Sequence, residues 1–265
     1  MNSEQQYIDL FQQCHSMIDA HSAAVMNALR EQAFQDFCRL GFPTKKVERY
    51  RYTDVPAAFA PDYGVNLNRL DIPVNPYEVF KCDVPNLSTS LYFMVNDVFY
   101  SKIQPPVALP DGVIVCSLRD AAQNHPDLVS RYYAKQARTH KDAINALNTM
   151  LVQDGLFVYV PRNVVLERTL QIVNILRSDV DLMVNRRVLV VLEDNAEAHI
   201  LFCDHAADNK NFLTTQVAEV YVGNNARLQL YELEETHVKN KRFGNLYVDQ
   251  QASSNVSLNT ITLHN

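Results

Sequence analysis

The first part of the chain places hydrophobic residues at helical spacing. Over residues 4–40 they recur every three or four positions among Gln, Asp, Glu and Arg, which predicts a helix. Ser3 and Gln6 fit a capping box at its start, and a break is predicted near residues 20–22. Gly41 fits the residue that follows a helix C-terminus.

Beyond this helix, prolines are dense up to about residue 90, which excludes long regular elements there. Two apolar runs around a two-residue turn predict a hairpin over residues 91–100. Helical spacing returns over residues 117–137, where Pro126 interrupts or restarts the helix, and over residues 143–150.

From about Val152 strand-like alternation replaces helical spacing, and the sequence repeats. Segments around Asn195, Asn225 and Asn255 align at intervals of 30 residues, and a weaker copy around Asn163 precedes them by 32. Strand-like units of this length without a helix in each are typical of stacked coils. The fold class predicted is mainly β, a right-handed parallel β-helix of about 30 residues per coil after an α-helical N-terminal region.

The repeat also assigns the direction of side chains. Asn tolerates the left-handed backbone that coil corners need, and stacked Asn side chains can form a ladder. Positions predicted to face inward are small and apolar: Ala196, Ala226 and Val256. Positions predicted to face outward are polar: His199, Gln229 and Asn259. Two domains are expected, the helical and irregular residues 1–150 and the β-helix of residues 151–265.

Composition narrows the class of protein. The net charge of −6 over 265 residues argues against a protein built mainly to bind nucleic acid. Five scattered cysteines without a CxxC pair favour neither a disulfide framework nor a zinc site. The longest apolar run, residues 188–192, is too short to span a membrane, and the polar start lacks a signal-peptide pattern. We therefore expect a cytoplasmic protein without a membrane segment.

Two stretches resemble the SufB/SufD family of iron–sulfur cluster assembly scaffolds. The first is residues 41–55, GFPTKKVERYRYTDV. The second combines residues 146–148 (ALN), 154–155 (DG) and 160–167 (VPRNVVLE). The first motif favours SufD over SufB, and the absence of CxxC agrees. Tyr50 departs from the family, which usually carries Trp there.

The resemblance implies a non-catalytic scaffold that pairs with SufB-like and SufC-like subunits. It implies no cofactor on this chain, and an iron–sulfur cluster only transiently in the assembled complex. Family members are substantially longer, and their cluster and ATPase-docking positions lie later than Asn265, so no catalytic or metal-binding residue is carried over. We expect the chain to be part of a longer protein, and the sequence leaves a homodimer open. No GxxxxGK loop is present, so the chain itself does not resemble the ATPase.

Cys203 and His205 are the most tempting pair for iron, because residues two apart share one face of a strand. The 30-residue register aligns Cys203 with apolar residues and His205 with polar ones. Their aligned partners are Leu233 and Leu263 for Cys203, and Glu235 and Asn265 for His205. We therefore predict that Cys203 is a core residue and that His205 is solvated.

Other histidines carry weaker signals. His199 belongs to the polar row predicted to face outward. His237 follows Glu234 and Glu235, and a solvated coil corner is favoured there over a metal site between carboxylates. His264 lies at the end of the last predicted coil and receives no role.

A basic cluster lies within the first family motif. Lys45, Lys46, Arg49 and Arg51 interleave with Tyr50 and Tyr52, a pattern that can grip nucleic acid by charge and stacking. The acidic net charge and the resemblance favour a structural role instead. Thr53 or Asp54 is expected to cap a helix or form a turn.

The predicted fold leaves two other functions open. One is a parallel β-helix enzyme acting on polysaccharide, which the outward row does not support because it offers no paired carboxylates. The other is a self-associating solenoid with no chemistry of its own.

Overall fold

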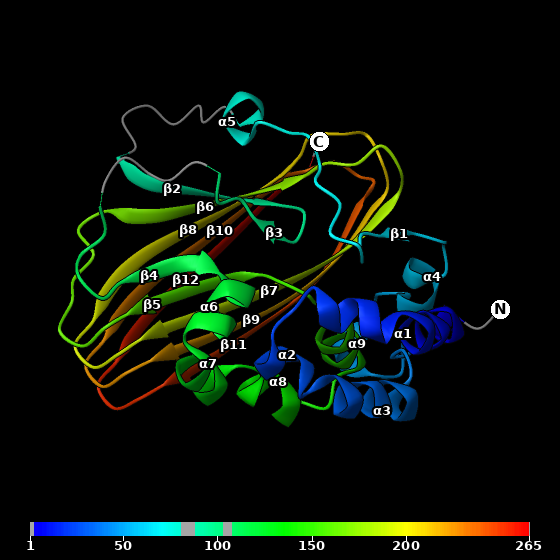
Figure 1. Cartoon of the computed structure of the whole chain (residues 1–265), viewed down its shortest axis with the longest axis horizontal. Coiled ribbons are helices and arrows are strands. Elements are labelled where there is room, and N and C mark those ends of the chain that lie inside the picture. Colours follow the sequence, from blue (N-terminus) through cyan, green and yellow to red (C-terminus); the bar gives the residue numbers. More distant parts are fainter. Residues whose placement is uncertain (1–2, 81–87, 103–107, 265) are drawn as a thin grey trace.

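The strands form two six-stranded sheets that face each other as a parallel β-solenoid of about four turns, with about 30 residues per coil. The computed structural model describes residues 3–80, 88–102 and 108–264 (Figure 1). Sheet A contains β1 (Gly64–Val65), β4 (Ile114–Ser117), β5 (Leu156–Val160), β7 (Leu182–Leu192), β9 (Phe212–Val222) and β11 (Asn240–Gln250). Sheet B contains β2 (Thr89–Val95), β3 (Val98–Phe99), β6 (Thr169–Leu176), β8 (Glu197–Ala206), β10 (Arg227–Thr236) and β12 (Asn255–His264). The predicted fold class is confirmed.

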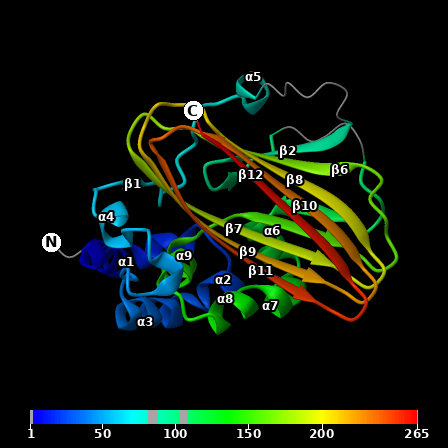
Figure 2. The ribbon, with the colours of Figure 1, turned by 180° about the vertical axis from the view of Figure 1, so that it is seen from behind.

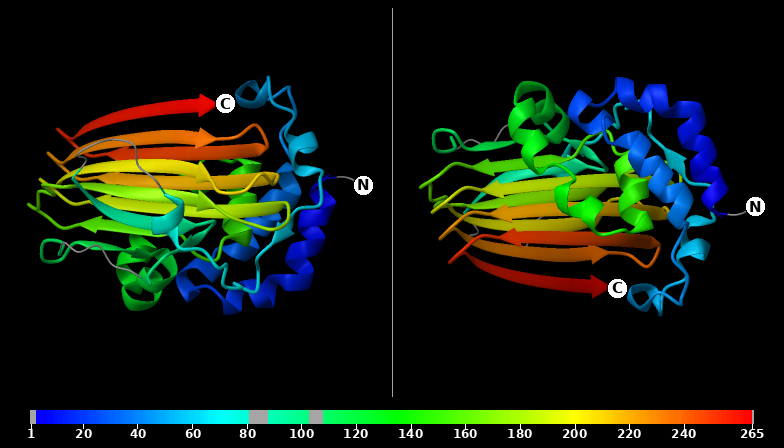
Figure 3. Two further views of the ribbon diagram at one scale, coloured as in Figure 1. Left: turned by 90° about the horizontal axis from the view of Figure 1, so that it is seen from above. Right: turned by 90° about the horizontal axis from the view of Figure 1, so that it is seen from below.

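Alternation along the strands builds the core between the sheets. Val188, Val190 and Leu192 of β7 face the space between the sheets and meet residues such as Ala198 and Ile200 of β8. Every residue of β7 is buried, because helices cover the outer face of sheet A while sheet B covers the inner face. Figure 3 shows the strands stacked along the solenoid, with β12 outermost at one end.

The coil corners correct the predicted register. Positive φ angles occur at Asn163, Asn195 and Asn225, as expected, but the fourth corner is Ser253 rather than Asn255. Asn255 pairs instead with Arg227, at a spacing of 28 residues. The last coil is two residues shorter than the 30-residue repeat, so its partners shift by two while each side chain keeps its predicted face.

The helices, apart from α5 beside sheet B, lie along sheet A and around the start of its strands (Figures 1 and 2). They are α1 (Ser3–Ala20), α2 (Ala24–Asn27), α3 (Arg30–Leu40), η1 (Glu48–Tyr50), α4 (Val55–Phe59), α5 (Pro76–Val79), α6 (Leu118–Asn124), α7 (Pro126–Tyr132), α8 (Lys135–Thr139) and α9 (Ala143–Leu151). The break near residue 20 is confirmed, as is the restart at Pro126. The capping box is wrong, because Ser3 lies inside α1 and the Gln6 side chain donates to the carbonyl of Phe59.

The predicted hairpin is confirmed, with β2 and β3 joined by a turn in which Asn96 has a positive φ. The hairpin is not an isolated element, as the sequence suggested, but part of a large sheet. β2 also pairs in parallel with β6, and β4 pairs with β5, so strands from before residue 150 complete both sheets. The division into domains at residue 150 stays a prediction.

Candidate functional site

A column of charged side chains lies between the two sheets, at the end where β8 and β10 finish. Arg186 of β7 bonds Asp204 of β8, with Nη1 and Oδ1 2.5 Å apart. Arg242 of β11 lies 3.1 Å from a Glu232 oxygen and 3.7 Å from oxygens of Asp204 and Glu234. Three carboxylates thus face two guanidinium groups inside the solenoid.

The pKa values of the two buried arginines shift in opposite directions. Burial lowers the pKa of Arg186 despite the Asp204 carboxylate. Burial also opposes the charge of Arg242, but the carboxylates of Asp204, Glu232 and Glu234 outweigh it and raise the pKa of Arg242. Such a column costs much desolvation, so it is weak evidence for stability. Its effect is to make this half of the interior polar.

The sequence reasoning missed this column, although a signal was present. Arg186 has the same strand parity as Val188 and Val190, and Asp204 the same parity as Ile200 and Phe202. Charged residues at inward positions of several successive strands were therefore readable from alternation alone.

Two hollows flank β11, the last strand of sheet A. One, of about 600 Å³, lies between β11 and the segment from Arg49 to Ala58. The other, of about 370 Å³, lies on the inner side of β11 and is lined by Glu232, Glu234 and Arg242. Among the described residues, no strand pairs with the outer edges of β11 and β12. The inner hollow connects the charged column with this open end.

The first family motif docks the N-terminal helices onto the solenoid. Gly41 has φ +62°, and the next backbone amide, that of Phe42, donates to Glu4 at 2.7 Å. Asp142 accepts from the Tyr50 hydroxyl at 2.7 Å and from Arg49, which also donates to the side chain of an asparagine on β11. The structural role expected for this motif is confirmed.

Two of the four basic side chains in the predicted cluster pair with carboxylates of the same motif. Lys45 pairs with Asp54, and Arg51 lies 3.9 Å from Glu48. Asp54 also caps α4 by accepting from the amide of Ala57, which confirms the expected cap. The Tyr52 ring is 89% exposed.

The second motif closes the first coil against the helices. A Cβ on Gly155 would meet the Arg187 carbonyl oxygen at 2.1 Å, so only glycine permits this approach of β5 to β7. The buried Asp154 accepts from Ser117 and from the Gly155 amide. Asn148 donates to the carbonyl of Arg186, which ties α9 to sheet A. Both motifs are therefore used for joining parts of the fold.

Cys203 and His205 lie on the outer face of sheet B, not inside the coil. Cys203 is 4% exposed, so its predicted burial is confirmed, but it packs with Phe93 and Val173 outside the solenoid. His205 is not freely solvated, because the Phe80 ring lies 5.3 Å from it. Burial lowers the pKa of His205, against the opposing effect of the Glu235 carboxylate.

The shorter last coil changes their aligned partners. Cys203 aligns with Leu233 and Ile261 rather than with Leu263. His205 aligns with Glu235 and Leu263 rather than with Asn265, which lies outside the described residues. The third member of the His199 and Gln229 row is likewise Ser257, not Asn259.

His237 lies at a coil corner, as predicted. It contacts the Asp208 carbonyl at 2.8 Å and accepts from the Lys239 amide. The two glutamates before it diverge, since Glu234 points to Arg242 inside and Glu235 to His205 outside. Within the described ranges, no group of three His, Cys, Asp or Glu side chains is placed to hold a metal ion.

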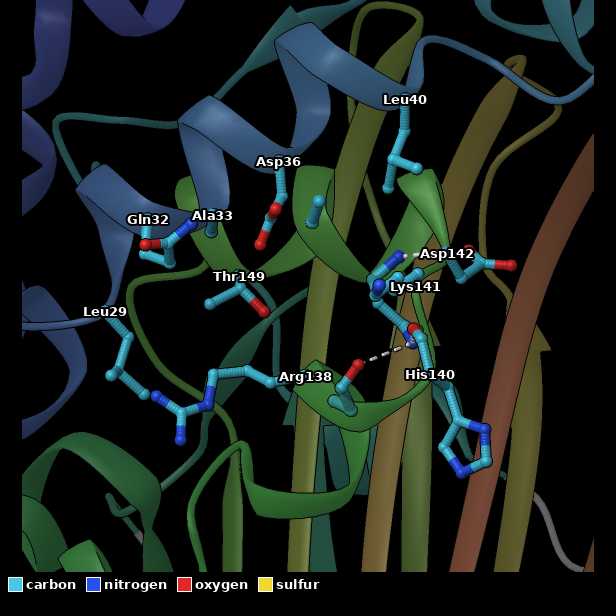
Figure 4. Close-up of a pocket in the computed structure, with 13 residues that line it drawn as sticks. Leu29, Gln32, Ala33, Asp36, Leu40, Arg138, His140, Lys141, Asp142 and Thr149 are labelled. Atoms are coloured by element: carbon cyan, nitrogen blue, oxygen red, sulfur yellow. Dashed lines mark hydrogen bonds between the residues drawn. The ribbon is translucent and has the colours of Figure 1, made fainter.

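A small slot separates α3 from the turn between α8 and α9 (Figure 4). Asp36 and Leu40 of α3, together with Leu29 just before that helix, form one wall, opposite Arg138 and Lys141. Its volume of about 30 Å³ holds about two water molecules, far less than an organic cofactor needs. In the parts of the chain that are described, no helix is long and apolar enough to cross a membrane.

These features define a parallel β-solenoid with a docked helical region, in which two sequence motifs make the joins. Residues 1–172 match the family model described as the SufBD protein N-terminal region, and residues 175–265 match the SufBD core domain of the SUF system for FeS cluster assembly. The chain therefore belongs to the SufB/SufD family of iron–sulfur cluster assembly proteins.

Relatives agree with this family. The chain is 31% identical to the iron–sulfur cluster assembly protein SufD of Bacillus subtilis over 147 residues, which cover 54% of this chain and 33% of that protein. It is 23% identical over 236 residues to a SufBD family protein of Synechocystis, covering 86% and 50%. It is 26% identical over 196 residues to one of Arabidopsis thaliana, covering 74% and 41%. The aligned parts make up a third to a half of these relatives.

Proposed function

We propose that the protein is a SufD-like, non-catalytic scaffold subunit that acts with a SufB-like subunit and a SufC-like ATPase. The observation that carries the proposal is the match of the two family models, one after the other, across nearly the whole chain. The SufD assignment rests on the identity to the B. subtilis protein and on the motif of residues 41–55. In this proposal the protein works in the cytoplasm, and an iron–sulfur cluster is cargo of the complex.

Co-expression tests the proposal. The full-length protein, tagged, is expressed with the SufB-like and SufC-like proteins of the same organism and purified through the tag. We expect both partners in near-stoichiometric amounts. Recovery of neither partner, from cells in which both are soluble, would refute the proposal. The double variant Arg49→Ala with Tyr50→Phe weakens the docking of residues 41–55 on the solenoid. It serves as the control that shows how general misfolding affects recovery of the partners.

A further inference from the structure

The outer face of sheet B is covered by a short segment of different character from the helices on sheet A. Residues 75–80, here called the cover segment, include α5 and lie above β2 and β6 in Figure 1. Tyr77 and Phe80 place their rings 4.6 Å and 6.0 Å from the ring of Phe93 on β2. Phe80 also lies against His205 of β8.

Beneath the cover segment runs one apolar row that crosses the whole sheet. Strand pairing aligns Phe93 with Val173, Cys203, Leu233 and Ile261 in turn. The row is buried at one end and exposed at the other: Phe93 is 2% exposed, Cys203 4% and Ile261 53%. The covered and the bare parts thus belong to one continuous surface.

Among the described residues, ring and other side-chain contacts attach the cover segment to this row. The hydrogen bonds that its residues make to other described residues stay within the segment, such as Tyr77 N to Asn75 Oδ1 and Phe80 N to the Pro76 carbonyl. Tyr77 is 39% exposed and Val79 40% exposed. Within the described ranges the segment thus makes no hydrogen bond to the strands below it, and a segment held in this way by few buried contacts opens at low cost.

We propose that the cover segment is a displaceable cover, which lifts from sheet B while the solenoid stays folded. Lifting it opens Phe93, Val173 and Cys203, and so extends the surface formed by the half-buried Leu233 and the exposed Ile261 across the sheet. The helices on sheet A are different, because their contacts include buried hydrogen bonds such as that from Asn148 to the Arg186 carbonyl.

Alkylation of Cys203 reports this opening. The full chain is exposed to iodoacetamide at a series of urea concentrations below the unfolding transition, and each cysteine is followed by peptide mass spectrometry. Cys38, which is exposed, supplies the rate of an accessible thiol in the same sample. We expect Cys203 to react at a rate nearly independent of urea, because local opening exposes little surface.

A ring deletion provides the second measurement. Phe80→Ala is expected to speed labelling of Cys203 by about tenfold or more, since it removes the contacts of one ring. Phe34→Ala, which removes a half-buried ring stacked on Phe11 far from sheet B, is the matched control and should leave that rate unchanged.

Two results would overturn the proposal. One is labelling of Cys203 that follows the steep urea dependence of global unfolding, measured by circular dichroism, down to zero urea. The other is an unchanged rate in a folded Phe80→Ala protein. If that variant does not fold, the urea series on the unaltered chain decides by itself.

Discussion

Glu219 of β9 and Arg187 of β7 form an ion pair between sheet A and the helices, and its removal allows a quantitative test. Both side chains are 0% exposed, and Arg187 Nη2 lies 2.8 Å from Glu219 Oε2. Glu219 also accepts from the backbone amides of Ala134, Gln136 and Ala137, which fixes the start of α8. The carboxylate outweighs burial and raises the pKa of Arg187, so this side chain stays charged.

Glu219→Gln keeps the volume but leaves the Arg187 charge unpaired in the interior. Breaking a fully buried pair from one side costs about 3–5 kcal/mol. Against a total stability of about 5–15 kcal/mol this is a large loss. With a urea slope of about 3 kcal/mol/M, the unfolding midpoint should fall by about 1–2 M.

Urea unfolding followed by circular dichroism measures this change, with two controls. Asp36→Asn removes an exposed pair with Arg39 and should cost less than about 1 kcal/mol. The double variant Arg187→Gln with Glu219→Gln should lose less than the sum of the single variants, because no unpaired charge remains. A loss below about 1 kcal/mol for Glu219→Gln, or strict additivity in the double variant, would refute the reasoning.

Three further outcomes are expected. Gly155→Ala should lower the free energy of unfolding by several kcal/mol or prevent folding, because the added Cβ would meet a backbone oxygen at 2.1 Å. Gly244→Ala, whose added Cβ has its nearest contact at 3.6 Å, should change the free energy of unfolding by less than about 1 kcal/mol. Soluble yield and urea midpoints compare the two variants. Asn195→Ala should lower the free energy of unfolding by about 1–2 kcal/mol, because Asn195 has a left-handed backbone that alanine tolerates poorly. Asn255→Ala should change it hardly at all, because Asn255 has no positive φ. Equal losses in the two variants would contradict the corrected register. Because the pKa of His205 is lowered in the folded state, the unfolded chain binds this proton first, and stability should fall as pH drops below about 6.5. Urea midpoints at pH 7.5 and 5.5 test this, and His205→Gln should show a smaller drop; an identical drop would assign the effect to other groups.

The class of fold follows from the amino-acid pattern. Alternation and repeated Asn corners indicate stacked coils, because each coil must bury one face of its strands and turn through a left-handed residue. The motif of residues 41–55 pointed to the family that the comparisons confirm. The Asn195 corner and the hairpin before β6 were likewise readable, since local backbone preferences specify them.

The remaining features depend on packing between residues far apart in the chain. The last coil is shorter by two residues, and pairing between β10 and β12, not sequence similarity, sets its register. Cys203 is buried outside the coil rather than inside it, because the cover segment and neighbouring strands meet there over long sequence separations. The charged column joins Arg186, Asp204 and Arg242 from three strands, and its charges are tolerated only because each finds a partner in the folded solenoid.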